Sequence, residues 1–179
     1  GLTATTTSNF DVSPWTNLSA NVPVTSDIYR ISCPTANTCF ALAQADSTSN
    51  TSFIRTTDGG ANWTSFNSGY SILSSTTSLA GGISCPDTST CYIAGSNSSS
   101  NKILKVTNAS AVTPTITQMG NTGFYRSISC PTTTFCIAVG TNTAQRTTDG
   151  TNWTSISTAF SWVTINCFDT NTCYGGQVN

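Results

Sequence analysis

The stretch ISCPTANTCFALA, residues 31–43, occurs four times in related form along this chain of 179 residues. Its relatives are ISCPDTSTCYIAG at 83–95, ISCPTTTFCIAVG at 128–140 and INCFDTNTCYGG at 165–176. Each copy holds two cysteines six positions apart, and apolar, β-forming residues flank a turn-like centre rich in Thr, Asn and Asp. This pattern predicts four β-hairpins. Because internal repetition marks a repetitive architecture, it also decides the fold class.

All eight cysteines belong to these four pairs. Residues that face each other on antiparallel strands place their Cα atoms at disulfide distance, so we expect four local bridges. Zinc is the alternative, but structural zinc sites use more closely spaced cysteines and often His, and the chain has no His. Disulfides place a protein outside a reducing cytosol, so we expect an extracellular or cell-surface location. The expected bridges, with no metal site, are Cys33–Cys39, Cys85–Cys91, Cys130–Cys136 and Cys167–Cys173.

A second block follows the cysteine hairpin in the first and third repeats. It reads RTTDGGANWT at 55–64 and RTTDGTNWT at 146–154, with a weaker relative at 105–108. The plain interpretation is a strand, an Asp-Gly turn and another strand, so each full repeat has four short strands. The fourth repeat stops after its second strand, whereas residues 5–18 hold a degenerate relative of the second block without a cysteine hairpin. The two ends of the sequence are therefore complementary halves of one repeat.

Successive first cysteines lie about 52, 45 and 37 residues apart, and the interval through both termini is about 45. Such intervals suit four-stranded propeller blades. Radial repetition of small sheets also lets all-β proteins avoid long open edges. We therefore expect an all-β, small four-bladed β-propeller in one domain, 1–179, with a disulfide-stapled hairpin in each blade and the last blade completed by N-terminal strands. The expected blades are approximately 24–69, 70–120, 121–160, and 161–179 together with 1–20.

Composition excludes several classes of function. Charged residues make up 7% of the chain and the formal net charge is −1, so we expect no partner among nucleic acids or anionic membranes. No apolar run approaches the ~18 residues that a membrane span needs. The chain begins at Gly1 without an initiator Met, which fits a processed, secreted chain. Its Ser-, Thr- and Asn-rich surface suits attached sugar or close packing against copies of itself.

The second block resembles the hairpin motif of the Asp-box, or BNR-like, β-propeller repeats, Ser/Thr-x-Asp-x-Gly-x-x-Trp. The copy at 56–63 fits fully, the copy at 147–153 has Thr151 at the Gly position, and the N-terminal relative keeps only Ser8 and Trp15. The Ser-Cys-Pro hairpin is similar to that of secreted bacterial repeat proteins in the same broad group. The residues that carry the resemblance are Thr56, Asp58, Gly60 and Trp63, and Thr147, Asp149 and Trp153.

The resemblance implies structural roles. In that family the Asp box is a folding element at the blade periphery, so Asp58 and Asp149 would stabilise turns through hydrogen bonds to the backbone. We expect Trp15, Trp63 and Trp153 to pack between blades. The family includes sialidases, which need a Tyr paired with Glu, and this chain contains no Glu. Hydrolysis by two carboxylates stays open only to Asp pairs, and these lie mostly in turns, so we expect no catalytic residues and no cofactor.

Aromatic and arginine residues stand just before the first strand of three repeats. They are Tyr29 with Arg30, Tyr125 with Arg126, and Trp162. If the first strands line a central channel, these side chains gather near one mouth, where aromatic faces and Arg donors suit sugar rings. The alternative is that they simply fill a narrow channel.

We expect a non-enzymatic structural or adhesive protein, in which the N-terminal half-blade of one copy completes the last blade of its neighbour by β-strand addition. Head-to-tail contacts of this kind propagate into a pilus-like filament. Residues 1–18 would be the donated segment and 21–23 the hinge. The alternative is a soluble, lectin-like propeller, so the expected partner is either a second copy or a surface glycan. Among six Asn-x-Ser/Thr sequons, the candidate glycosylation sites are Asn17, Asn50, Asn97 and Asn108.

Overall fold

A computed structural model describes residues 22–23, 27–44, 51–71, 81–96, 101–119, 123–156 and 160–178. These ranges contain fourteen β-strands and no helix. Blade 1 consists of β1 (Ile28–Ser32), β2 (Cys39–Gln44), β3 (Thr51–Thr56) and β4 (Thr64–Asn67), and blade 2 of β5 (Gly82–Ser84), β6 (Cys91–Ser96), β7 (Asn101–Thr107) and β8 (Thr115–Met119). Blade 3 consists of β9 (Phe124–Ser129), β10 (Cys136–Thr141), β11 (Thr143–Thr147) and β12 (Thr154–Ser155), and blade 4 of β13 (Ser161–Cys167) and β14 (Cys173–Val178).

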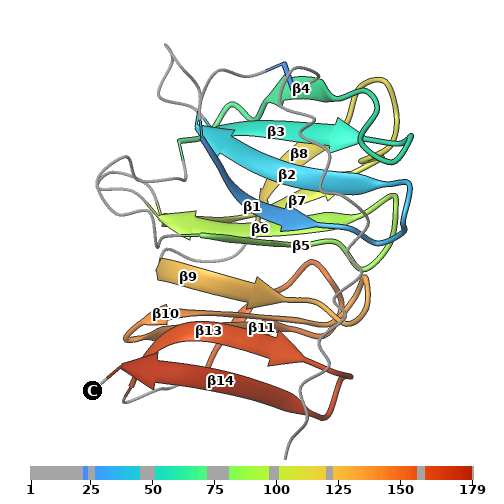
Figure 1. Ribbon diagram of the computed structural model, residues 1–179. Coiled ribbons are helices and arrows are strands. Elements are labelled where there is room, and N and C mark those ends of the chain that lie inside the picture. Colours follow the sequence, from blue (N-terminus) through green and yellow to red (C-terminus); the bar gives the residue numbers. More distant parts are fainter. Residues whose placement is uncertain are drawn as a thin grey trace, which may run out of the picture.

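Every blade is an antiparallel sheet whose strands follow one another in chain order. The blades also follow one another in space, with blade 1 at one end of the arrangement and blade 4 at the other (Figure 1). The all-β class and the repeated blade are thus confirmed. Blade 4 has two strands in the described part of the chain, while the other blades have four. Its expected completion by residues 1–20 lies outside the described residues, as do Trp15, Asn17, Asn50 and Asn97.

The four predicted disulfides are confirmed. The Cα atoms of the bridged cysteines lie 4.1, 4.1, 4.1 and 3.9 Å apart in blades 1 to 4. Each bridge closes the loop between the first two strands of its blade. The bridges therefore fix single hairpins and do not join distant parts of the chain.

Each cysteine loop is also held by a side chain two positions after its first cysteine. In blade 1, the hydroxyl of Thr35 accepts a hydrogen bond from the amide of Thr38, 3.0 Å away. Such a side chain mimics a backbone turn, which explains why Thr or Asp recurs at this position. The equivalent amide-to-side-chain bonds run from Thr90 to Asp87, from Phe135 to Thr132, and from Thr172 to Asp169.

The core lies between the blades. Because side chains alternate across a strand, each blade has an upstream face toward the preceding blade and a downstream face toward the following one. Between blades 1 and 2, the downstream Phe40, Leu42 and Phe53 pack in one cluster with the upstream Cys85 and Ile93, among others. The corresponding cluster between blades 2 and 3 combines Tyr92, Ala94 and Ile103 with Tyr125, Ile128, Cys130, Cys136, Ala138 and Trp153. Each contact between these blades thus buries apolar side chains from both of them.

A β-bulge lies at the same place in three blades. The register between the first two strands shifts around Tyr29 in blade 1, Arg126 in blade 3 and Val163 in blade 4. Each of these residues stands four positions before the first cysteine of its repeat. In blade 3 the bulge brings the strands so close that a Cβ at Gly140 would lie 1.7 Å from the carbonyl oxygen of Phe124, so only Gly fits there.

Burial predicts unequal contributions from the disulfides. Replacement of both Cys33 and Cys39 by Ala should lower the free energy of unfolding by roughly 2 kcal/mol, the chain-entropy contribution of so short a loop. The same change at Cys85 and Cys91 should cost about 1 kcal/mol more, because both of these cysteines are buried and their removal leaves a cavity. Urea denaturation of the two variants tests this difference, and equal losses would contradict it.

Candidate functional site

The Asp-containing turns have closely similar hydrogen bonding in blades 1 and 3. The Asp58 carboxylate accepts bonds from the hydroxyl of Thr56 and from the backbone and side-chain nitrogens of Asn62, at 2.8 to 2.9 Å. Asp149 accepts the equivalent bonds from Thr147 and Asn152. These bonds hold the pKa of Asp58 at about 2 and lower the pKa of Asp149 as well, the largest cause being the bonds from Asn62 and from Asn152 respectively. Both carboxylates therefore stabilise their own turns by accepting hydrogen bonds within them.

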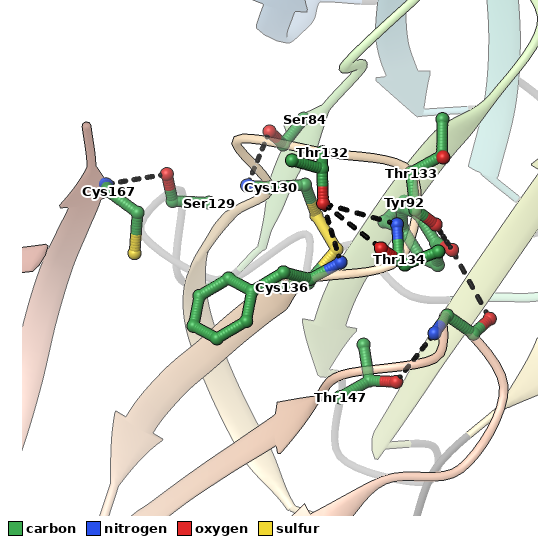
Figure 2. The surroundings of a disulfide bond; sticks show 12 residues. Ser84, Tyr92, Ser129, Cys130, Thr132, Thr133, Thr134, Cys136, Thr147 and Cys167 are labelled. Carbon is green, nitrogen blue, oxygen red and sulfur yellow. Dashed lines mark hydrogen bonds between the residues drawn. A yellow bond between two sulfur atoms is a disulfide. The ribbon is translucent and has the colours of Figure 1, made fainter. Parts of the chain in front are cut away.

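The turn of blade 3 also anchors the preceding blade. The buried hydroxyl of Tyr92 donates to the carbonyl oxygens of Thr133, 2.6 Å away, and Gly150, 3.2 Å away (Figure 2). Gly150 has a φ of +71°, and a Cβ there would lie 2.6 Å from that hydroxyl, so both the turn and the close approach require Gly. Trp153 packs edge-on against the ring of Tyr92 and is buried, whereas Trp63 is half-buried.

A hydrogen bond between consecutive blades recurs three times. The serine before the first cysteine of a blade accepts a bond from the amide of the first cysteine of the next blade. Figure 2 shows two of these bonds, from Cys130 to Ser84 at 3.0 Å and from Cys167 to Ser129 at 2.8 Å. The third runs from Cys85 to Ser32, also at 3.0 Å. The repeated Ser-Cys dipeptide is the sequence signal for this ladder, and sequence reasoning assigned it no role.

A second contact between blades uses a cation on the third strand. Arg55 on β3 is buried and donates to the carbonyl oxygens of Ala109 and Ala111, in the turn that follows β7 of blade 2. Lys105 on β7 donates to the carbonyl oxygen of Gly150, 3.0 Å away, in the corresponding turn of blade 3. Arg146 has the same register position on β11, opposite the residue after the second cysteine. Its side chain is exposed and has no acceptor among the described residues.

The aromatic and arginine residues proposed for glycan binding do not form one surface. Tyr29 stands four residues before its first cysteine and Tyr125 five, so the two are not equivalent. Tyr125 is fully buried, which raises the pKa of its hydroxyl to about 12, and it has no surface to offer a ligand. Trp162 is equivalent to Tyr125 and is half-buried, 6.5 Å from the ring of Phe160. Strand β5 also lies between β1, which carries Tyr29, and the strands β9 and β13, which carry Tyr125 and Trp162 (Figure 1). Tyr29 therefore lies apart from the other two aromatic residues.

The two arginines of this set are engaged locally. Arg30 donates to the carbonyl oxygens of Gly81 and Tyr29, at 2.9 and 2.7 Å. Arg126 lies over the ring of Phe124, 5.8 Å from its centroid, and its buried Nε has no hydrogen-bond partner among the described residues. The Arg30 guanidinium is therefore held by hydrogen bonds to the backbone, whereas that of Arg126 has only its aromatic contact among the described residues.

Two cavities lie beside the blades. The first, of 180 Å³, is apolar and lies between blades 3 and 4. The second, of 460 Å³, lies along β4 of blade 1 and the segment that leads into β8. The first is lined by Ile137, Val139, Ala144, Ile156, Trp162, Ile165, Cys173 and Gly175, and the second by Ser65, Phe66, Asn67, Ser68, Thr113, Pro114 and Ile116.

Within the described ranges, no group of three or more His, Cys, Asp or Glu side chains could hold a metal ion. No helix in the described residues is long and apolar enough to cross a membrane. Asn108, the one candidate glycosylation site that is described, is exposed in the turn after β7. The sequon residues Asn62 and Asn152 instead use their side-chain nitrogens to bind the turn aspartates.

The serine ladder predicts a measurable loss on removal of one hydroxyl. The Ser84→Ala variant should unfold with a free energy about 1–3 kcal/mol lower than wild type, because the amide of the buried Cys130 loses its acceptor. The exposed Ser155, on the edge strand β12, provides the matched control, and Ser155→Ala should change the free energy by less than about 0.5 kcal/mol. Similar values for the two variants in urea denaturation would contradict the role of the ladder.

The turn aspartates predict acid lability. Asp58 has a pKa of about 2 in the folded chain, below its ordinary value of 3.8. A carboxyl whose pKa falls on folding contributes stability above its ordinary pKa, and this contribution is lost as the pH falls toward the folded value. The free energy of unfolding should therefore decrease between about pH 4 and pH 2, and less steeply in the double variant Asp58→Asn, Asp149→Asn. An unchanged slope in chemical denaturation across this range would refute the assignment.

No family model matches the chain, and the search of curated proteins finds no match. Solved structures do match. One of them, described as YCF48 bound to D1 peptide, is 18% identical, with a TM-score of 0.55, over 75% of this chain and 42% of that chain. The chain spans less than half the length of that YCF48 chain, which is a β-propeller. At this identity the likeness shows the fold alone, and the predicted β-propeller-like fold is thereby confirmed.

Proposed function

We propose that the chain is a non-enzymatic, extracellular structural or adhesive protein whose copies assemble by β-strand complementation. The observation that carries this proposal is the incomplete blade 4. In blades 1 to 3 the second strand pairs with a third, whereas β14 pairs only with β13 in the described part of the chain. A free strand edge offers a row of unpaired backbone donors and acceptors, which is the template that strand addition uses.

The N-terminal sequence supplies what this blade lacks. Residues 5–18 resemble the third and fourth strands of the other repeats, with Ser8 and Trp15 in place of the motif residues. Arg146 supports the same assignment, because Arg55 and Lys105 each donate to the turn between the third and fourth strands of the next blade. A hairpin formed by residues 5–18 on β14 would bring such a turn to Arg146. Donation of this segment between copies gives a head-to-tail chain of subunits.

Chemistry supports an extracellular, non-catalytic role. Four disulfides and no free cysteine in the described residues suit an oxidising compartment. The carboxylates of Asp58 and Asp149 have lowered pKa values and accept hydrogen bonds within their own turns, so they are poor general acids. The same Thr-Asp turns support our assignment of the repeats to the Asp-box type. In this interpretation the turns are folding elements and the chain binds copies of itself.

A lectin-like function is the second candidate. The observation that favours it is the apolar cavity between blades 3 and 4, which Trp162 lines. An aromatic face beside a small apolar cavity suits the apolar side of a sugar ring. This function predicts glycan-array binding that is lost on Trp162→Ala and kept in the control Tyr70→Ala, which changes another half-buried aromatic residue.

Deletion of residues 1–18 tests the structural proposal. Wild-type protein should form polymers in negative-stain electron microscopy, and the shortened chain should stay monomeric. A synthetic peptide of residues 1–18, added in excess, should bind the shortened chain with 1:1 stoichiometry in isothermal titration calorimetry. A peptide in which Trp15 is replaced by Ala should bind at least tenfold more weakly. Polymers formed equally well by the shortened chain would contradict strand complementation, as would uniform compact monomers of the wild-type chain.

A further inference from the structure

The upstream face of blade 1 is open where the same face of other blades is covered. Ile31, two positions before the first cysteine, is 59% exposed, whereas Ile83 and Ile128 at the same position are buried. Cys33 and Ile28 are exposed as well. Farther out on this face, Ala41 and Ile54 are buried. The open part is therefore the first strand, β1, together with its disulfide.

The downstream face of blade 4 is open in the complementary way. Tyr174, the residue after the second cysteine, is 74% exposed. Its equivalents Phe40 and Tyr92 are fully buried, each against the cysteine hairpin of the next blade. An exposed tyrosine at a position that holds a buried aromatic anchor in blades 1 and 2 marks an unfilled interface.

The serine ladder is interrupted at these same two faces. Blade 4 has Asn166 where the other blades have an acceptor serine, and its side chain is exposed without a partner among the described residues. The amides of the other three first cysteines each donate to a serine of the preceding blade. At the other end of the arrangement, the amide of Cys33 donates to no serine within the described ranges. An Asn side-chain oxygen accepts the same hydrogen bond as a Ser hydroxyl. The acceptor and donor of a fourth rung are therefore both present, at opposite ends of the arrangement.

We propose that the upstream face of blade 1 of a second copy docks on the downstream face of blade 4, and repeats across subunits the interface that joins blades within the chain. In this contact the side chain of Asn166 accepts a hydrogen bond from the amide of Cys33 of the next copy. Tyr174 covers Ile31 and the exposed Cys33–Cys39 disulfide of that next copy. The two faces differ, so the contact is heterologous and leaves one open face at each end. It can therefore propagate.

The arrangement of the blades favours a second copy over closure within one molecule. Blade 1 and blade 4 lie at opposite ends (Figure 1), and no strand of blade 1 packs closely on β13 or β14 in the described part of the chain. The inference rests on the proposed function and deepens it. In blades 1 and 2 the fourth strand leads into the first strand of the next blade. A donated segment 1–18 leads in the same way into β1, which would place blade 1 of the donor beside blade 4 of the recipient.

Two single substitutions block the two faces separately. Tyr174→Arg blocks the downstream face and Ile31→Arg the upstream face, and both residues are exposed, so each chain should still fold. In sedimentation velocity, wild-type protein should form polymers and each variant alone should stay monomeric at concentrations at least tenfold higher. In an equimolar mixture, the Tyr174→Arg chain keeps its upstream face and the Ile31→Arg chain keeps its downstream face. These two intact faces can pair once, so the mixture should give dimers without larger species. Val112→Arg, at a residue that is 88% exposed on blade 2, is the control and should polymerise like wild type.

The outcomes separate this inference from the proposed function. If both face variants polymerise like wild type while deletion of residues 1–18 abolishes polymers, strand donation stands and the docking of the faces is wrong. If wild-type protein is monomeric and both face variants lower its melting temperature by several degrees, the faces close on each other within one molecule, and both proposals fail. Larger polymers in the equimolar mixture would also overturn the heterologous contact.

Discussion

The hydrogen bond from the first cysteine amide of one blade to the serine of the preceding blade sets the spacing on which the rest of the structure depends. It holds the cysteine hairpins of neighbouring blades at a fixed distance. At that distance, Phe40 and Tyr92, which follow the second cysteines of blades 1 and 2, are buried against the disulfide of the next blade. The disulfides stiffen the hairpins so that this contact can repeat. Arg55 on β3 and Lys105 on β7 add hydrogen bonds to the next blade in the outer part of the same interface.

Charged residues make up 7% of the chain, so ion pairs contribute little, and the apolar clusters between the blades and these backbone contacts hold the blades together. Four of the charged residues bind the backbone: Arg55 and Lys105 donate to carbonyl oxygens of the next blade, and Asp58 and Asp149 accept hydrogen bonds from amides of their own turns. Stability therefore resides in faces that need a neighbouring blade. Any blade at an end of the arrangement leaves such a face open, which connects the fold directly to assembly.

Much of the fold was predictable from the sequence because its determinants are local. The six-residue cysteine spacing and the Thr-x-Asp turns act within one hairpin, so the bridges and turn positions follow from residue order alone. The glycan-binding set was less predictable because it depends on register. The two Tyr-Arg pairs differ by one position relative to their first cysteines, so the bulge, which lies four positions before that cysteine in both blades, falls at Tyr29 in blade 1 and at Arg126 in blade 3, and Tyr125 is buried in the core. The contacts of Arg55 and Lys105 join residues 45 to 56 positions apart, for which no local pattern exists.

The most direct test of a serine ladder that continues between copies is amide hydrogen exchange at the four first cysteines, in dilute monomer and in polymer. The amides of Cys85, Cys130 and Cys167 should be protected in both states, because their acceptors lie within the chain. The amide of Cys33 should exchange rapidly in the monomer and become protected in the polymer. Protection of Cys33 already in the dilute monomer, or rapid exchange that persists in the polymer, would contradict the account.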